Sequence, residues 1–187
     1  MDEVGLVKRL QQHDEAAFKV LVVEYQDMII NTCYGFLHNV EESEDVAQEV
    51  FIQVFKSIDS FRGDSKLSTW LYRIAVNKSL NKIRLRKSKF LVAVDSLFES
   101  SVKGDIKEWR TPFSTLENKE RAEILHEAIE KLPENQKTAF VLSKYQGLSN
   151  KKIAEVMKLT LSSVEALSNR AKKNLQKNLI SYYKSGN

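Results

Sequence analysis

Glycine and proline are scarce in this sequence, which holds six glycines and two prolines among its 187 residues. Both residue types interrupt regular structure, so their scarcity favours helices joined by short connections. Apolar residues recur at helical spacing through most of the chain. We expect helices at residues 3–12, 14–37, 40–58, 70–89, 116–131, 133–145, 149–157 and 161–182. The sequence therefore predicts an all-α fold.

One long segment without helical periodicity divides the chain. Residues 90–114 mix serine, glycine, both signs of charge and isolated large apolar side chains, which is typical of a linker that rests against another surface. The predicted architecture is two small helical domains, at residues 1–89 and 115–187, joined by this linker. A hydrophobic content of 42% is enough to give each domain a packed core.

Several classes of protein are disfavoured by what the sequence lacks. No window approaches the roughly 20 apolar residues of a membrane span, and the N-terminus has no apolar signal core. The single Cys33 can form neither an internal disulfide nor a cysteine-rich zinc site. His13, His38 and His126 lie outside any metal-ligand spacing, and no nucleophile motif or phosphate loop occurs. We expect a cytoplasmic protein that is no enzyme and takes no metal, cofactor or small-molecule substrate.

Residues 61–89 change from a loop into a basic helix. Residues 62–65 have the glycine and polar content of a turn, and Ser68 or Thr69 can cap a helix that opens at Trp70. The helix that follows has no acidic residue, and its cations are interleaved with aromatic and amide side chains. Such a surface suits a strand of nucleic acid, because phosphates attract cations while unstacked bases lie on rings. A solvated helix face is the alternative interpretation.

The helix expected at residues 40–58 separates an apolar face from an acidic one. No lysine or arginine occurs between His38 and Phe55. Acids near a helix N-terminus are favoured by the macrodipole alone, but an acidic surface is a poor one to offer DNA and indicates a protein-docking face. The side expected to be buried holds Val46, Val50, Phe51, Val54, Phe55 and Ile58. The opposite side holds, at helical spacing, Asp45, Gln48, Glu49 and Ile52.

Two helices joined by a three-residue turn follow Gly147-Leu148-Ser149, which is the layout of a helix-turn-helix. The second helix has a core side and a side with small and polar residues that can approach DNA and read base edges. The core side holds Val164, Leu167, Ala171 and Leu175. The other side holds Ser162, Glu165, Ala166, Asn169, Arg170 and Lys173.

Two ordered sets of motifs resemble the bacterial sigma-70 family of RNA polymerase sigma factors. Three runs resemble region two of this family: 45–51 (DVAQEVF), 61–63 (FRG) and 68–77 (STWLYRIAVN). Region four is resembled by Leu132-Pro133 and by the runs 147–149 (GLS), 153–155 (IAE) and 164–172 (VEALSNRAK). Two such regions with a short linker between them are similar to the extracytoplasmic-function (ECF) group.

The resemblance implies a factor that binds core RNA polymerase, directs it to specific promoters and promotes strand opening. The implied partners are the clamp helices of the largest polymerase subunit, the β-subunit flap, promoter DNA and an anti-sigma factor. Core polymerase would bind Asp45, Gln48, Glu49 and Ile52. A helix-turn-helix repressor or activator that binds duplex DNA as a dimer is the alternative, and it would bind DNA without polymerase.

The resemblance also implies where promoter DNA binds. The loop at residues 61–67 would receive a base flipped from the minus-ten element, and Asn77 would help to read it. Lys158 stands where the family often has glycine with a positive φ, and Ser168 stands where leucine or isoleucine is more usual. The minus-ten contacts would be Phe61, Arg62, Gly63, Asp64, Ser65, Lys66, Trp70, Arg73 and Asn77. The minus-thirty-five contacts would be Ser162, Ser163, Glu165, Ala166, Asn169, Arg170 and Lys173.

Overall fold

The computed structural model describes residues 2–96 and 116–185, and in these two ranges all the regular structure is helical. The prediction of an all-α fold is confirmed. None of the helices in these ranges is long and apolar enough to cross a membrane. The N-terminal half contains α1 (Glu3–Gln11), α2 (Glu15–Leu37), α3 (Val40–Ser57), the short 3-10 helix η1 (Ile58–Ser60) and α4 (Leu67–Ser96). The C-terminal half contains α5 (Leu116–Glu130), α6 (Glu134–Lys144), α7 (Asn150–Met157) and α8 (Leu161–Ser185).

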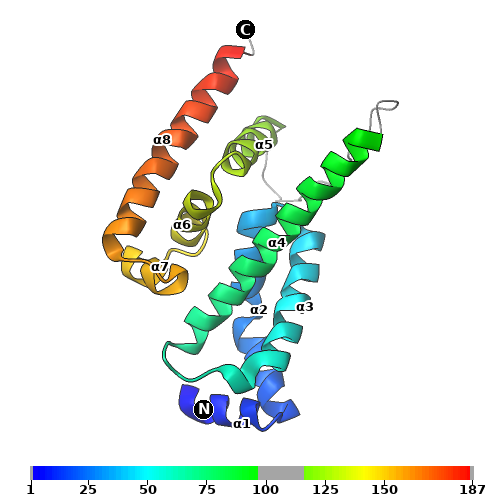
Figure 1. The fold of residues 1–187 in the computed structure, drawn as a ribbon, viewed down its shortest axis with the longest axis vertical. Helices are drawn as coiled ribbons and strands as arrows, with labels where there is room; N and C mark the ends of the chain where they lie inside the picture. Colours follow the sequence, from blue (N-terminus) through cyan, green and yellow to red (C-terminus); the bar gives the residue numbers. More distant parts are fainter. Residues whose placement is uncertain (1, 97–115, 186–187) are drawn as a thin grey trace.

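The N-terminal half is a bundle of α2, α3 and α4, with α1 lying across one end (Figure 1). Asp14 caps α2 by accepting hydrogen bonds from the Ala16 and Ala17 amides, and Asn39 caps α3 through the Glu42 amide. Such caps satisfy amides that have no partner within the helix. The largest fully buried side chains of this bundle are Leu21, Ile29, Phe36, Val46, Val50, Val54, Leu67 and Leu71.

The start of α4 differs from the prediction. Ser68 and Thr69 do not cap a helix that opens at Trp70, because the helix begins at Leu67. The Leu67 amide donates instead to Oε1 of Glu3 at 3.0 Å. The carboxylate of Glu3 therefore takes the place of a local cap, from a position 64 residues earlier in the chain.

The end of α4 also differs from the prediction. Residues 90–96 were expected to begin the linker, but α4 continues through Ser96. Residues 84–94 contain neither glycine nor proline and are rich in leucine, arginine and lysine. An established helix propagates through such residues even where apolar periodicity is lost. The rest of the predicted linker, 97–114, lies outside the described residues.

The C-terminal half has an apolar cluster of its own, where α8 packs on α5. Lys158 ends α7 with φ of 55°, which confirms the positive φ expected at the helix-turn-helix turn. Ser168 lies on the inner side of α8, and its buried Oγ has no hydrogen-bond partner among the described residues. The buried residues of this cluster are Ala128, Ile129, Leu132, Ala171 and Leu175.

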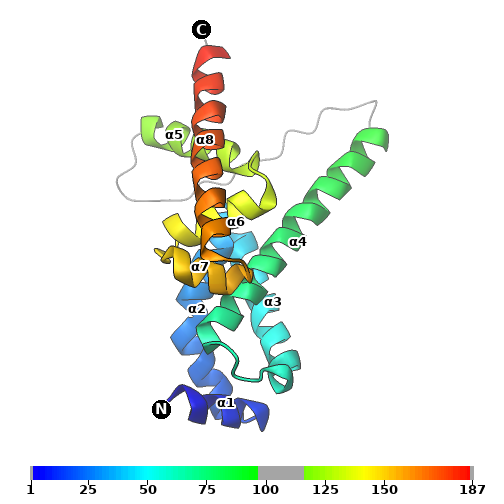
Figure 2. The ribbon, with the colours of Figure 1, turned by 60° about the vertical axis from the view of Figure 1, so that its left-hand side comes forward.

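The two halves pack against each other, with α6 on α2 and α7 on α4 (Figure 2). Val141, Leu142 and Ile153 of the C-terminal half belong to the same apolar cluster as the N-terminal bundle. The approach is close at Gly35, where a Cβ atom would lie 2.6 Å from Cγ1 of Val141 and 3.1 Å from Cγ of Tyr145. Only glycine therefore permits this contact.

Two histidine rings meet in this interface. His38 at the end of α2 stacks on His126 of α5, with ring centroids 3.9 Å apart and ring planes 8° apart. Burial lowers the pKa of His38 to about 3, and the neighbouring His126, Lys137 and Arg86 act in the same direction. Burial also lowers the pKa of His126, although Glu130 and Glu123 oppose this shift. The packed arrangement therefore favours neutral rings.

Gly35→Ala should separate the two halves without harming α2. Alanine favours a helix interior over glycine by about 0.5–1 kcal/mol, whereas overpacking a well-packed contact costs about 1–3 kcal/mol. Small-angle scattering should show a larger radius of gyration, and the α6 amides should exchange faster with solvent. Asn31→Ala, on an exposed position of the same helix, is the control and should change neither. An unchanged radius of gyration in Gly35→Ala would contradict the close approach.

Lowering the pH should also separate the halves. An exposed histidine has a pKa of about 6.5, and that of packed His38 is about 3. The stabilisation is therefore complete above about pH 6.5 and is lost progressively as the pH falls from 6.5 toward 3. At about pH 5.5 the equilibrium should move roughly tenfold toward separated halves, as measured by scattering.

Two histidine variants test this pH dependence. His38→Asn keeps a residue that tolerates the left-handed backbone of His38 (φ 54°) and does not titrate, so the pH dependence should become weaker. His13 has the same φ of 54° but contacts Asp59 and Phe55, away from the interface. His13→Asn should therefore retain the full pH dependence. Equal behaviour of the two variants would show that His38 is not the responsible group.

Candidate nucleic-acid and protein interfaces

The acidic face of α3 is exposed, as predicted. Ile52 lies near its centre with 54% of its surface exposed, although a large aliphatic side chain is normally buried. Glu49 forms an ion pair with Lys78 of α4 at 3.3 Å. The four side chains of this acidic face, which are those predicted to dock on core polymerase, are all exposed: Asp45, Gln48, Glu49 and Ile52.

The opposite side of α3 is buried with two exceptions, of which the first is the half-buried Phe51. Val46, Val50 and Val54 are buried as predicted, but Phe55 is 45% exposed. Its ring lies edge-on to that of Phe18, with centroids 5.5 Å apart. Phe55 therefore covers the end of the bundle near α1 and is not part of the central core.

The loop at residues 61–66 exposes polar groups to solvent and rests on packed aromatic side chains. Gly63 has φ of 78°, a conformation that side-chain-bearing residues rarely adopt, and open space surrounds it. Phe61 is only 8% exposed, and its ring packs on Trp70 with centroids 5.2 Å apart. Phe61 thus supports the loop from below, while the exposed residues of the loop are Arg62, Gly63, Asp64 and Lys66.

A groove of about 530 Å³ lies beside this loop. One wall is the loop, with Arg62, Gly63 and Ser65, and the other wall is α1. The apolar spacing of residues 3–12 gives no sign of this groove in the sequence. The α1 side chains that line the groove include Val4, Val7 and Lys8.

Beyond the loop, some side chains of α4 contact α7 and others face solvent. Arg73 donates from Nη2 to the carbonyl oxygen of Glu155 at 2.7 Å and from Nε to that of Val156 at 3.2 Å. Carbonyls at the end of a helix carry partial negative charge, which favours a cation there. Lys152 also donates to Oγ1 of Thr69. Asn77, one turn beyond Arg73, remains exposed.

Several cations of the basic helix are paired within the chain. Arg84 donates two hydrogen bonds to Glu134, at 2.8 and 2.6 Å, and Arg86 bonds to Glu130. The hydrogen bond from Arg84 lowers the pKa of the Glu134 carboxyl. In this arrangement these arginines neutralise acids of α5 and α6 and do not face open solvent alone.

The outer face of the helix-turn-helix is open. Thr160 caps α8 by accepting a hydrogen bond from the Ser163 amide at 3.2 Å, and its hydroxyl lies 2.7 Å from Oγ of Ser163. On the core side Val164, Ala171 and Leu175 are buried as predicted, whereas Leu167 is half-buried. Ser163 and Ala166 are half-buried, and the exposed residues of the predicted reading face are Ser162, Glu165, Asn169, Arg170 and Lys173.

Metal ligands and the thiol of Cys33 are the candidates for reactive chemistry in the described ranges. No three histidine, cysteine or acidic side chains lie close enough there to hold a metal ion. Cys33 is buried, and burial raises the pKa of its thiol to about 11. At neutral pH this thiol is therefore protonated, and only the thiolate is a good nucleophile.

Two solved structures share this fold. CnrH in complex with the cytosolic domain of CnrY superimposes with a TM-score of 0.67 over 96% of this chain and 97% of that chain, at 21% identity. The sigma factor RpoE from Bartonella quintana, in complex with the anti-sigma factor NepR, gives a TM-score of 0.63 over 87% of this chain and 96% of that chain, at 20% identity. At these identities the likeness establishes the fold.

Sequence relationships extend over nearly the whole chain. The family model for sigma-70 region 2 matches residues 21–89, and that for sigma-70 region 4 matches residues 122–175. The RNA polymerase sigma-H factor of Pseudomonas aeruginosa is 36% identical over 93% of this chain and 92% of its own length. The ECF RNA polymerase sigma factor SigW of Bacillus subtilis is 32% identical over 92% of this chain and 94% of its own. The chain therefore belongs to the sigma-70 family of RNA polymerase sigma factors, in its ECF group.

Proposed function

We propose that this ECF sigma factor docks on core RNA polymerase through the face of α3, opens the minus-ten element with the 61–67 loop and α4, and reads the minus-thirty-five element with α8. The observation that carries the proposal is that one chain exposes an acidic helix face in region 2 and a polar reading face in region 4. A dimeric repressor has no use for the first of these surfaces.

The docking face combines an apolar anchor with acids. Ile52 would enter a hydrophobic site on the clamp helices of the largest subunit, and its burial would supply affinity. Asp45 and Glu49 would orient the complex against basic side chains, because charge complementarity mainly governs association rate and register. Glu49 would exchange its contact with Lys78 for one with the polymerase.

The loop and α4 would hold the separated strand. Unstacking a base costs a few kcal/mol, and a pocket that binds the flipped base offsets this cost. Arg62 and Lys66 are exposed cations suited to phosphates, and Asn77 is an exposed amide suited to a base edge. No bond is made or broken by this protein in such a step.

The first part of α8 would enter the major groove of the minus-thirty-five element. Asn169 and Arg170 have the donors and acceptors that pair with adenine and guanine edges, and Lys173 is placed for a phosphate. The small side chains of Ser162 and Ala166 would allow close approach to the DNA. The β-subunit flap is the polymerase partner that we assign to region 4.

The two halves would have to separate on a promoter. The centres of the two elements are about 25 base pairs apart, or roughly 85 Å at 3.4 Å per base pair. In the present arrangement α7 touches α4 at 2.7 Å through Arg73, and α8 follows α7 directly. The packed chain cannot read both elements at once. Because CnrH and RpoE were solved with CnrY and the anti-sigma factor NepR, we also assign this chain an anti-sigma partner that holds it inactive.

Transcription from a randomised promoter library tests the function directly. Core RNA polymerase with this protein should start transcription from a defined set of promoters that core polymerase alone does not use. The free protein should bind the selected DNA weakly in a gel shift, because Arg73 is occupied by α7. Tight binding of the free protein to a palindromic sequence would instead support the dimeric repressor.

Asp45→Lys should weaken binding to core polymerase by roughly five- to tenfold, because reversal removes an attraction and adds a repulsion at the interface. Titration of labelled protein with core polymerase measures the affinity, and the loss should shrink at high salt. Asp27→Lys changes net charge equally at an exposed position of α2 and is the control. Equal affinities of the two variants for core polymerase would show that this face of α3 is not the docking surface.

A further inference from the structure

The loop between η1 and α4 is held at both of its ends by α1. At one end, Nε2 of Gln11 donates to the carbonyl oxygen of Phe61 at 2.9 Å and lies 3.5 Å from that of Ile58. At the other end, Glu3 accepts from the Leu67 amide at 3.0 Å. These partners are about 50 and 64 residues apart in the chain. The helix therefore fixes the distance that the loop spans.

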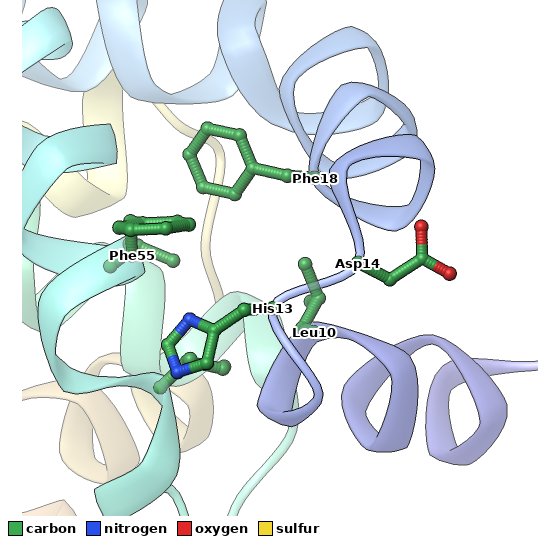
Figure 3. A pocket seen from close by; sticks show the side chains of 7 residues that line it. Leu10, His13, Asp14, Phe18 and Phe55 are labelled. Carbon is green, nitrogen blue, oxygen red and sulfur yellow. The ribbon is translucent and has the colours of Figure 1, made fainter.

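The helix α1 is itself fixed to the bundle. Leu6 and Leu10 are each only 3% exposed. In the last turn of α1, Arg9 contacts the Asp14 carboxylate at 2.7 Å. Figure 3 shows the His13 and Phe18 rings directed toward Phe55 of α3, and the Asp14 side chain directed away from them. With its apolar side and its last turn both anchored, α1 can hold the loop in one shape.

The groove between α1 and the loop has the chemistry of a nucleotide site. Its 530 Å³ lies within the roughly 300–1,000 Å³ typical of small-ligand sites. Val4 and Val7 give an apolar wall for the face of a base, and Lys8 and Arg62 give cations for phosphates. The one carboxylate on the α1 wall, that of Glu3, is engaged at the positive N-terminal end of α4.

We propose that α1 forms the second wall of the site that receives an unstacked nucleotide of the opened promoter strand, with Gln11 and Glu3 as positioning residues for the loop. This inference rests on the proposed function of the loop in strand opening. It extends the DNA-opening surface to α1. Its occupant is one nucleotide of single-stranded DNA, whose base lies against Val4 and Val7 and whose phosphate lies near Lys8 and Arg62.

The test uses holoenzyme made from core RNA polymerase and the full chain, on a duplex promoter selected from the library. Permanganate reactivity of thymines in the minus-ten element measures the rate of opening. A gel shift on ice measures the affinity of the closed complex. Gln11→Ala removes the amide, and Val4→Glu places a carboxylate on the groove wall at a position that is 62% exposed and so does not disturb the core.

Both variants should slow opening while closed-complex affinity stays unchanged. Loss of one hydrogen bond at the loop should slow opening by about three- to tenfold in Gln11→Ala. Val4→Glu should also slow it, because the added charge repels phosphates. The matched controls are Gln12→Ala, on the next exposed glutamine, and Val23→Glu, on an exposed valine of α2 that is distant in sequence, and both should open at the wild-type rate.

Opening at the wild-type rate by Val4→Glu would overturn the inference, whatever the behaviour of Gln11→Ala. Equal losses of opening and of closed-complex affinity would also overturn it, because they would indicate a general structural defect. If wild-type holoenzyme opens no promoter at all, the proposed function fails and the groove with it. If the wild-type holoenzyme opens the promoter and the variants open it at the same rate, only the proposed role of α1 is refuted.

Discussion

The close approach of α6 to α2 at Gly35 is the contact on which the arrangement of the molecule depends. A Cβ atom there would lie 2.6 Å from Val141, so glycine alone lets the apolar face of α6 join the N-terminal core. Burying an aliphatic side chain contributes about 1.5–3 kcal/mol, whereas exposed ion pairs contribute little because solvent screens them. The apolar contact therefore holds the halves together, and the arginine–glutamate pairs set their orientation.

Features that lie within one helix could be predicted from the sequence. The periodicity of α8 separated buried Val164 and Leu175 from exposed Asn169, and that of α3 exposed the docking face. The helix expected at residues 149–157 is α7, which Ser149 caps. These predictions succeeded because the side of a helix that is buried follows directly from the spacing of its apolar residues.

Features that join distant segments could not be predicted in this way. Ser68 was a plausible local cap for α4, yet the amide at Leu67 bonds to Glu3, and no local pattern distinguishes the two outcomes. The same holds for the groove beside α1 and for the need for glycine at position 35, which arises only when α6 is in place. Phe61 illustrates a further ambiguity, because an aromatic residue beside a polar loop can either stack on a nucleotide base or pack into the protein core.

The pairing of charges bears on how the chain changes from a packed form to a promoter-bound one. Arg84 and Arg86 bond to carboxylates of the C-terminal half, and the same guanidinium groups suit phosphates. On the proposed function, separation of the halves would replace the carboxylate partners of these arginines with DNA phosphates. The main cost of separation is then the loss of the apolar contact at Gly35. Asn77 is exposed before separation, whereas Arg73 is released only when α7 leaves. On the proposed function, the DNA surface of α4 would therefore be completed by the same movement that lets α8 reach the minus-thirty-five element.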